Sequence, residues 1–310
     1  MSLAESWGYL DQVRVRVPAK INLALRVGGR RADGYHELAT LFQAISLTDE
    51  ITATAGTSGI TCTVTGPYAD EVGPETDNLA YRAAALLRDE YAVAEGVDLI
   101  IDKRIPVAAG LAGGSADGAG ALLACARLWD LHLAPDELLH LGARLGADVP
   151  FALMGGCAVG LGRGDRLTPA LSRGLYHWVL AFAGYPLSTP AVFARFDELT
   201  GTTRLPAPEI PPALMMALTA GDVARVGDLL VNDLTPAACA LAPGLTTTLA
   251  AGREAGALAA IVSGSGPTVA FLARDQAAAT DLAVALSSQG IAQQVRLATG
   301  PVPGATVLAG

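Results

Sequence analysis

The chain has 310 residues, of which 51% are hydrophobic and 16% charged, so it can bury a large core in about two domains. Its formal net charge of −9 argues against nucleic acid as the main partner, because phosphate-backbone binding needs a basic face. The four cysteines and four histidines are widely spaced, which favours reduced thiols in a cytoplasmic protein over a zinc site or a disulfide framework. We find no secretory signal and no uninterrupted membrane-spanning apolar run, so no membrane partner is expected.

Mixed strands and helices are predicted along the chain. In order, we expect strands at 13–17, 21–27 and 60–64, a helix over 79–90 capped by Asp77, a strand at 97–101, and helices over 116–129 and 135–145. Later come a bent strand within 155–164, a strand at 178–183, helices at 214–218, 223–230, 245–254 and 276–287, and strands at 268–272 and 293–297. This irregular alternation predicts an α+β fold, with the first domain closing near residue 170.

A glycine-rich loop lies between the strand at 97–101 and the helix that follows it. It comprises Pro106, Val107, Ala108, Ala109, Gly110, Leu111, Ala112, Gly113, Gly114, Ser115 and Ala116. Ser115 is expected to cap the helix, with Asp117 in its first turn. Exposed backbone N–H groups beside a helix N-terminus favour phosphate binding, although such a turn can also be a plain surface connection. The loop matches neither a Walker-type nor a Rossmann pattern.

Three further segments carry polar side chains suited to chemistry. Lys20 and Asn22 lie two apart on a predicted strand and share a face, although they could simply face solvent. Lys20 and Lys103 are the two lysines among 21 basic residues. The pair Tyr35-His36 could stack on and hydrogen-bond a base, or form an ordinary turn. Asp148, in Gly-Ala-Asp-Val-Pro, could be a general base or a helix cap.

Together these segments resemble the GHMP small-molecule kinase superfamily, and the likeness covers nearly the whole chain. It rests on six motifs: Pro-Ala-Lys20-Ile-Asn22-Leu, Arg31-Ala-Asp-Gly-Tyr35-His36, Asp77-Asn78-Leu79, the loop from Ile105 to Asp117, Gly146-Ala-Asp148-Val-Pro150, and Ser263-Gly-Ser-Gly-Pro267. The Tyr-His segment is the more specific, and it resembles the member of the superfamily that acts on a cytidyl-diphosphate sugar alcohol.

The resemblance implies a two-domain kinase. Residues 1–170 would form a ribosomal-protein-S5-like domain and residues 171–310 a ferredoxin-like α/β sandwich, with the active site in the cleft between them. ATP and Mg²⁺ are the implied cofactors. Asp148 would be the general base and Lys20 its electrostatic partner, while the glycine-rich loop, with Asn78 and Lys103 towards the adenine, would hold ATP. Asn22, Tyr35, His36, Phe193 and Thr189 would bind the second substrate, and Gly264, Ser265 and Gly266 would close the phosphate site.

Two alanines depart from the family loop, which has glycine at position 112 and serine at position 116. Ala112 is acceptable only if its backbone does not need a positive φ, and Ala116 lacks a hydroxyl that could contact phosphate or Mg²⁺. The alternatives are another GHMP kinase, acting on homoserine, mevalonate or a sugar, and a nucleotide-binding module without catalysis. An NAD-dependent oxidoreductase lacks its fingerprint here. The sequence does not indicate the oligomeric state.

Overall fold

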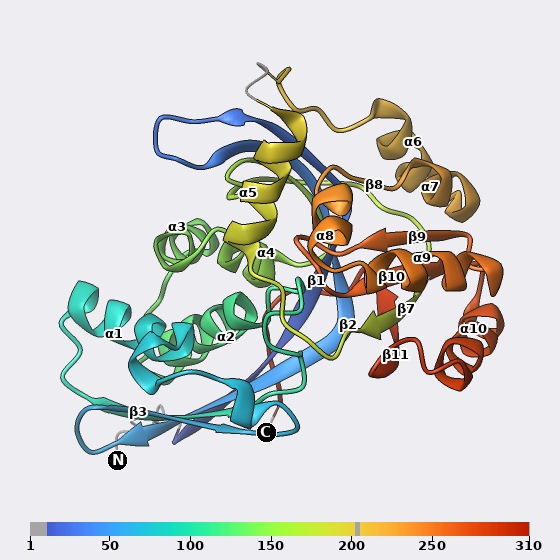
Figure 1. Ribbon diagram of the computed structural model, residues 1–310. Coiled ribbons are helices and arrows are strands. Elements are labelled where there is room, and N and C mark those ends of the chain that lie inside the picture. Colours follow the sequence, from blue (N-terminus) through green and yellow to red (C-terminus); the bar gives the residue numbers. More distant parts are fainter. Residues whose placement is uncertain (1–10, 202–204, 310) are drawn as a thin grey trace, which may run out of the picture.

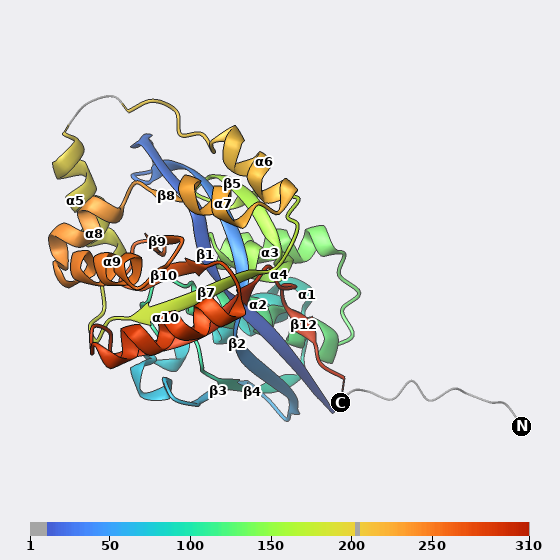
Figure 2. The same ribbon diagram turned by 90° about the vertical axis from the view of Figure 1, so that its right-hand side faces the viewer.

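The computed structural model describes residues 11–201 and 205–309, which form two β-sheets covered by helices (Figure 1). Two long antiparallel strands, β1 (Gln12–Arg30) and β2 (His36–Gly56), run through the first sheet and are conspicuous in both views (Figures 1 and 2). The other strands of this sheet are β3 (Ile60–Thr65), β4 (Gly96–Asp102), β5 (Cys157–Gly162), β6 (Arg166–Pro169), β8 (Val231–Asn232) and β12 (Thr306–Val307). The main strand order is β12-β1-β2-β4-β3; β5 pairs with β2 and β6, and β8 pairs with β1.

Strand β1 continues through Pro18, where the sequence predicts a break. Proline has no N–H to donate, and the register of the β1–β2 pair shifts between Pro18 and Ala19, which accommodates it. From Val17 to Leu25 every residue is buried, because α2 (Gly113–Leu128) and α4 (Val149–Met154) pack on this strand. Lys20 and Asn22 therefore lie in the buried part of the sheet, not on a solvent-facing strand.

Four helices belong to the first sheet. Besides α2 and α4 they are α1 (Leu79–Tyr91) and α3 (Pro135–Leu145), which confirms two predicted helices. Helix α1 is capped by Asn78, whose side chain accepts a hydrogen bond from the Ala80 N–H at 2.9 Å. The expectation that Asp77 is the cap was wrong by one residue, since Asp77 ends a short 3₁₀ turn, η2 (Glu75–Asp77), that follows η1 (Ala69–Glu71).

The second sheet has the order β11-β7-β10-β9. Its strands are β7 (Tyr176–Phe182), β9 (Ala259–Val262), β10 (Val269–Ala273) and β11 (Gln294–Gly300). Alternate residues of β7 face different cores. Tyr176 and Trp178 join the core of the first sheet, whereas Val179 and Ala181 pack under α9 (Gly244–Glu254) and α10 (Gln276–Ser288). This double burial explains why β7 reads as a continuous apolar run.

Helices α5 (Thr189–Thr200) and α8 (Thr235–Leu241) were not predicted from the sequence. Both contain a proline in the first turn, Pro190 and Pro236, where its missing N–H leaves no hydrogen bond unmade. Helix α5 packs against α8, and the two helices are neighbours in both views (Figures 1 and 2). The remaining helices are α6 (Pro212–Ala220) and α7 (Val223–Leu229), where helices were expected.

The arrangement confirms the α+β class. Residue 170 follows β6 of the first sheet and precedes β7 of the second. Strands β8 and β12 come from beyond that point, yet both pair with β1 of the first sheet. The chain thus returns to its first sheet twice, and the boundary at residue 170 stays a prediction.

Candidate active site

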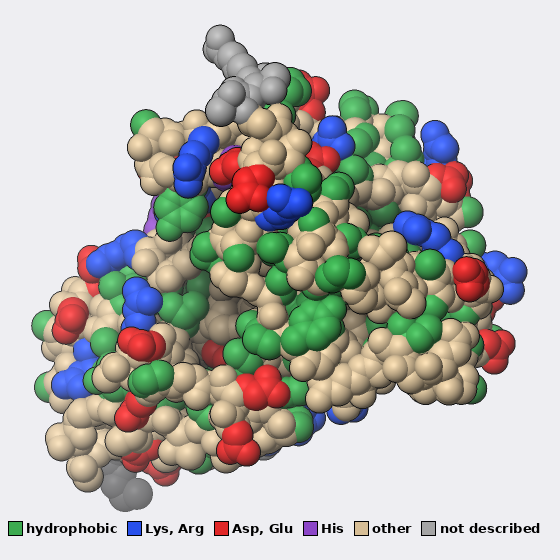
Figure 3. All heavy atoms as spheres, viewed as in Figure 1, with side chains coloured by type: hydrophobic (Ala, Val, Ile, Leu, Met, Phe, Trp, Pro, Cys, Tyr) green, Lys and Arg blue, Asp and Glu red, His purple; other side chains and the backbone are tan. Residues whose placement is uncertain are grey.

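A cleft of about 1180 Å³ opens between α2 and α5, and the space-filling view shows the molecular surface hollowed on this face (Figure 3). It is lined by residues from both halves of the chain. The predicted site residues among them are Lys20, Asn22, Tyr35, His36, Ala108, Ala109, Gly110, Ala112, Gly113, Gly114, Ser115, Asp148, Thr189, Phe193, Gly264 and Ser265. The cleft thus brings together six segments that are separate in sequence.

The glycine-rich loop forms one wall of the cleft and contacts the turn that follows β9. Gly110 has φ of +77°, and a Cβ at this position would lie 2.2 Å from the carbonyl oxygen of Ser263. The Ser263 hydroxyl donates to the Gly110 carbonyl at 3.1 Å, while the backbone N–H of Lys20 donates to the Leu111 carbonyl at 3.2 Å. The loop is therefore held between strand β1 and the Ser263 turn, and only glycine fits at position 110.

Helix α2 begins earlier than predicted. Its N-cap is Ala112, not Ser115, and Ala112 makes no side-chain capping bond. Ala112 adopts φ of +57°, so this position does use the left-handed conformation that alanine adopts at a cost of about 1–2 kcal/mol. The N–H groups of Gly113 and Gly114 belong to the uncapped first turn, where an anion is favoured by the helix dipole. Because no side chain caps this turn, its N–H groups are available to a phosphate group, which a serine cap would have hindered.

The position of Ala116 shows that the missing hydroxyl does not affect the cleft. Its side chain is fully buried in the core and does not line the cleft. A hydroxyl at this position would point into the protein interior, so its absence removes no cleft contact. The other predicted ATP-site residues that do not line the cleft are Pro106, Val107, Leu111, Asn78 and Lys103. Gly266 of the predicted closing turn does not line it either.

Lys103 is buried beneath the loop, so the expectation that its side chain approaches the adenine needs correction. Its Nζ lies 2.6 Å from Asp49 and 2.7 Å from Asp117, and all three side chains are almost completely buried. Burial alone would lower the pKa of Lys103, but the two carboxylates outweigh it and raise that pKa. Asp49 also accepts from the N–H groups of Arg104 and Ile105, so this cluster fixes the strand that enters the loop.

Asp117 does not lie in the first turn of the helix, where the sequence placed it, because α2 begins at Gly113, and its side chain is buried. Burial raises its pKa well above the usual aspartate range, against the lowering effect of Lys103. One carboxylate oxygen, Oδ1, is buried without a hydrogen-bond partner among the described residues. Asp117 and Lys103 thus belong to the interior support of the phosphate loop.

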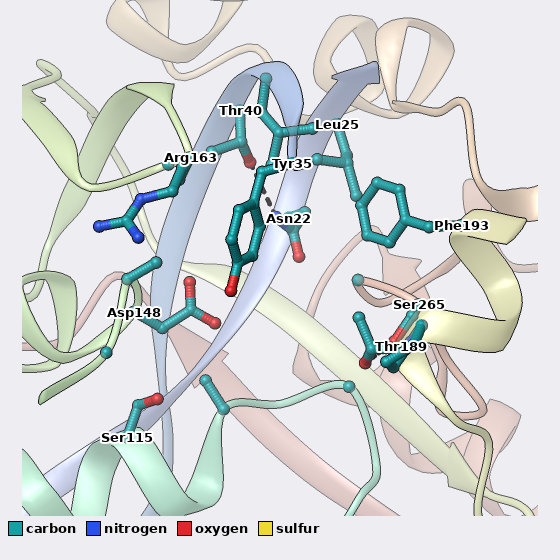
Figure 4. Close-up of a pocket in the computed structure, with 18 of the residues that line it drawn as sticks. Asn22, Leu25, Tyr35, Thr40, Ser115, Asp148, Arg163, Thr189, Phe193 and Ser265 are labelled. Carbon is teal, nitrogen blue, oxygen red and sulfur yellow. Dashed lines mark hydrogen bonds between the residues drawn. The ribbon is translucent and has the colours of Figure 1, made fainter. Parts of the chain in front are cut away.

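Lys20 and Asp148 face one another across the cleft. Lys20 Nζ donates to Asn22 Oδ1 at 2.9 Å and lies 3.8 Å from Asp148 Oδ2. The Asn22 amide in turn donates to the Thr40 hydroxyl at 2.8 Å, so the lysine rests on a buried hydrogen-bonded chain. Asp148 occupies the N-cap position of α4 but makes no side-chain cap bond. Its carboxylate is directed into the cleft (Figure 4), which argues against the capping alternative.

The opposite end of the cleft is aromatic. Tyr35 is 59% exposed, whereas His36 is buried and stacks on Phe193 with ring centroids 5.1 Å apart. Nε2 of His36 lies 2.7 Å from Oδ1 of Asp197 on α5. In Figure 4 the Tyr35 ring lies between Asp148 and Phe193, and thus between the charged and the aromatic ends of the cleft.

Arg163 lines the cleft and was missed by the sequence analysis. It follows β5, and its guanidinium carbon lies 5.6 Å from the centroid of the Tyr35 ring. Asp165 holds it through Nη2 at 2.9 Å and Nε at 3.3 Å. A position in Gly-Arg-Gly-Asp carries no local signal for this role, because the contact joins residues more than 100 positions apart.

The cleft is positive although the whole chain is acidic. Lys20, Arg30, Arg144 and Arg163 line it, against the carboxylates of Asp148 and Asp197. This excess of positive charge suits phosphorylated ligands. Among the described residues, no group of three His, Cys, Asp or Glu side chains could hold a metal ion, and no helix is long and apolar enough to cross a membrane.

Comparison with known proteins identifies the family. The models for the GHMP kinases N terminal domain and GHMP kinases C terminal match residues 78–156 and 214–292. The chain is 53% identical over 296 residues to the 4-diphosphocytidyl-2-C-methyl-D-erythritol kinase of Streptomyces coelicolor, covering 96% of this chain and 99% of that relative. It is equally identical over 296 residues to the enzyme of that name from Nocardia farcinica, covering 96% of each chain.

Solved structures agree with this assignment. A crystal structure of 4-(cytidine 5'-diphospho)-2C-methyl-D-erythritol kinase superposes with a TM-score of 0.74 at 36% identity, covering 92% of this chain and 98% of that one. A homoserine kinase from Cytophaga hutchinsonii superposes with a TM-score of 0.75, but at 20% identity it shows the fold alone; it covers 97% of this chain and 98% of that one. The two-domain GHMP kinase fold is confirmed. The chain belongs to the GHMP kinase family, and within it to the 4-diphosphocytidyl-2-C-methyl-D-erythritol kinases.

Proposed function

We propose that this protein transfers the γ-phosphoryl group of ATP to the 2-hydroxyl of 4-diphosphocytidyl-2-C-methyl-D-erythritol, a step of non-mevalonate isoprenoid precursor synthesis. The observation that carries the proposal is the order of groups along one cleft. The uncapped N-terminus of α2 lies at one end, Lys20 and Asp148 face each other, and Tyr35 lies towards Phe193. From one end to the other, these groups suit the phosphates of ATP, the hydroxyl that is phosphorylated and the cytosine ring of the second substrate.

Asp148 is proposed as the general base. Its carboxylate would accept the proton of the 2-hydroxyl as the oxygen attacks the γ-phosphorus, while the bond from that phosphorus to the β-phosphate oxygen breaks and ADP leaves. Lys20 would stabilise the negative charge that develops on the attacking oxygen. Its hydrogen bond to Asn22 and burial within β1 keep it oriented, so little reorganisation is needed during the reaction.

ATP is proposed to bind with its phosphates at Gly110, Gly113, Gly114 and Ser115. A Cβ at Gly114 would meet no atom within 4 Å, so open space adjoins the backbone there. Ser265 and Thr189, whose hydroxyl oxygens are 2.8 Å apart, would close this site from the second half of the chain.

Mg²⁺ is proposed as the metal cofactor. Since the described residues offer no three-ligand cluster of their own, ATP phosphates would supply most of its oxygens, as is usual for Mg²⁺ in kinases. Ser115, whose hydroxyl lies in the first turn of α2 beside the proposed phosphate site, would complete its coordination. Bound Mg²⁺ would neutralise charge on the β- and γ-phosphates.

Binding of the second substrate is proposed to use its cytosine and its hydroxyl end. Tyr35 and Phe193 would stack on cytosine, His36 would read its edge, and Asn22 would contact the portion near Lys20. We also propose a cytoplasmic location, because all four cysteines are free thiols.

The test is an ADP-release assay with the purified chain and Mg²⁺. The panel contains the cytidyl-diphosphate substrate, homoserine, mevalonate and a free sugar. ADP release with the cytidyl substrate alone supports the proposal. Release with another acceptor in its place would favour a different GHMP kinase activity, and ATP binding without release on any acceptor would indicate a binding module.

A further inference from the structure

The buried imidazole of His36 is held by a carboxylate that the proposed reaction does not use. Its Nε2 lies 2.7 Å from Oδ1 of Asp197, and only 6% of the His36 side chain is exposed. A carboxylate can only accept in such a bond, so Nε2 must carry the hydrogen. In the neutral imidazole, Nδ1 is then an acceptor.

The second ring nitrogen of His36, Nδ1, is accessible on a residue that lines the cleft. Among the described residues Nδ1 has no hydrogen-bond partner, and it is not fully buried. Both His36 and Asp197 line the cleft. Because the two ring nitrogens point in diverging directions, an imidazole held at Nε2 by α5 keeps Nδ1 free to accept a hydrogen bond from a ligand in the cleft.

The stacking geometry places a ligand in the plane of the imidazole. The rings of His36 and Phe193 are 21° from parallel, with centroids 5.1 Å apart, so they are laterally offset. Phe196 meets His36 edge-on, with centroids 6.0 Å apart, which further fixes the ring. A base bonded edge-to-edge to Nδ1 would lie roughly coplanar with His36, on the ring that Phe193 and Phe196 hold in place.

We infer that Asp197 is a positioning residue that makes the site selective for cytosine over uracil; the inference rests on the proposed function. It holds His36 in the tautomer with hydrogen on Nε2, so that Nδ1 accepts from the exocyclic amino group of cytosine. Uracil presents a carbonyl oxygen at that position, which would leave two acceptors facing one another. A site built around a hydrogen bond rejects a ligand that cannot make it.

The binding test compares CDP with UDP in the presence of Mg²⁺ and a non-hydrolysable ATP analogue. The wild-type chain should bind CDP roughly 10- to 100-fold more tightly than UDP. In Asp197→Ala the affinities for CDP and UDP should differ by about threefold or less, chiefly because CDP binds more weakly. Glu198→Ala is the matched control, because Glu198 is the next acidic residue of α5 but pairs with Arg195 and does not line the cleft. Its ratio should match that of the wild type.

The tautomer is measured directly by ¹⁵N NMR of the imidazoles in the ligand-free protein, with His36→Asn used to assign the signal. The wild type should show hydrogen on Nε2, and Asp197→Ala should show a mixture, while Glu198→Ala shows no change. An unchanged CDP/UDP ratio in Asp197→Ala, or hydrogen on Nδ1 in the wild type, would overturn the inference. Because the NMR measurement needs no turnover, absence of ADP release by the wild type would contradict the proposed function alone.

Discussion

Lys20 Nζ lies 3.8 Å from Asp148 Oδ2, at the outer limit of an ion pair, yet only 2.9 Å from Oδ1 of the Asn22 side chain. The lysine is thus held by a neutral partner and directed towards the carboxylate without being closed onto it. A substrate hydroxyl placed between the two would contact both groups. This relationship is the basis of the proposed phosphoryl transfer.

Replacing the lysine tests this relationship. Lys20→Ala should lower kcat by roughly 10²–10⁴ while the fold is kept, because charge on the attacking oxygen loses its stabilising partner. Lys20→Arg should fail to restore the rate, because the lysine is almost completely buried and a planar guanidinium is larger than the ammonium that Asn22 holds. Steady-state ADP release measures kcat, and circular dichroism checks that the fold is kept. Near-normal kcat in Lys20→Ala would remove lysine from the mechanism.

Gly110 is predicted to be essential for stability. Gly110→Ala places a methyl group 2.2 Å from the Ser263 carbonyl oxygen at a φ of +77°, and the backbone strain alone costs about 1–3 kcal/mol. Gly114→Ala is the matched control in the same loop, because no atom lies within 4 Å of its added Cβ. Urea unfolding should show a clearly lower free energy of unfolding for Gly110→Ala and a change of less than about 0.5 kcal/mol for Gly114→Ala. Equal stability of the two variants would contradict the described contact.

The buried cluster of Lys103, Asp49 and Asp117 predicts an asymmetric response to mutation. Lys103→Met leaves the buried Asp49 carboxylate without its cation and should lower the free energy of unfolding by about 3–5 kcal/mol at pH 7. Asp117→Asn should be far milder, because burial already favours the neutral form by raising the pKa of Asp117. Chemical unfolding of both variants at pH 7 measures the difference. A milder loss for Lys103→Met than for Asp117→Asn would contradict the charge assignment.

The same cluster gives a pH dependence with a definite sign. Asp117 binds its proton more tightly when folded, so its stabilising contribution is complete below the pKa of an unfolded aspartate, about 3.9, and is lost as pH rises through the raised value. Asp117→Asn should remove this component. The difference in unfolding free energy, variant minus wild type, should therefore increase as pH rises above about 4.

Arg163 is predicted to support base binding through Tyr35. Arg163→Ala should raise the KM for the cytidyl substrate roughly two- to fivefold, the effect of one cation–π contact, and leave the KM for ATP unchanged. Arg166→Ala is the control, because Arg166 lies three residues away, pairs with Glu37 and does not line the cleft. Initial-rate measurements on both variants decide. An equal rise in both values of KM would indicate a general disturbance of the β5–β6 hairpin.

Sequence reasoning located the main parts of the site but not their support. The glycine-rich loop, Lys20 and Asp148 were found because each has a local pattern, and all three reach one cleft. Lys103 was placed wrongly because its partners are set by tertiary packing, with Asp49 lying 54 positions away in the chain. Pro190 and Pro236 concealed two helices, since a proline in a first turn reads like a break. Arg163 and Asp197 carry no local signal at all.

The role of Asp148 is the central claim, and single-turnover phosphoryl transfer in Asp148→Asn tests it most directly. Asparagine keeps the shape of the side chain but cannot accept the proton. The rate of phosphorylated product formation at saturating ATP and cytidyl substrate should fall by roughly 10²–10⁴. Asp136→Asn, in the exposed first turn of α3, should leave the rate unchanged. A rate for Asp148→Asn within about threefold of the wild type would contradict the proposed mechanism.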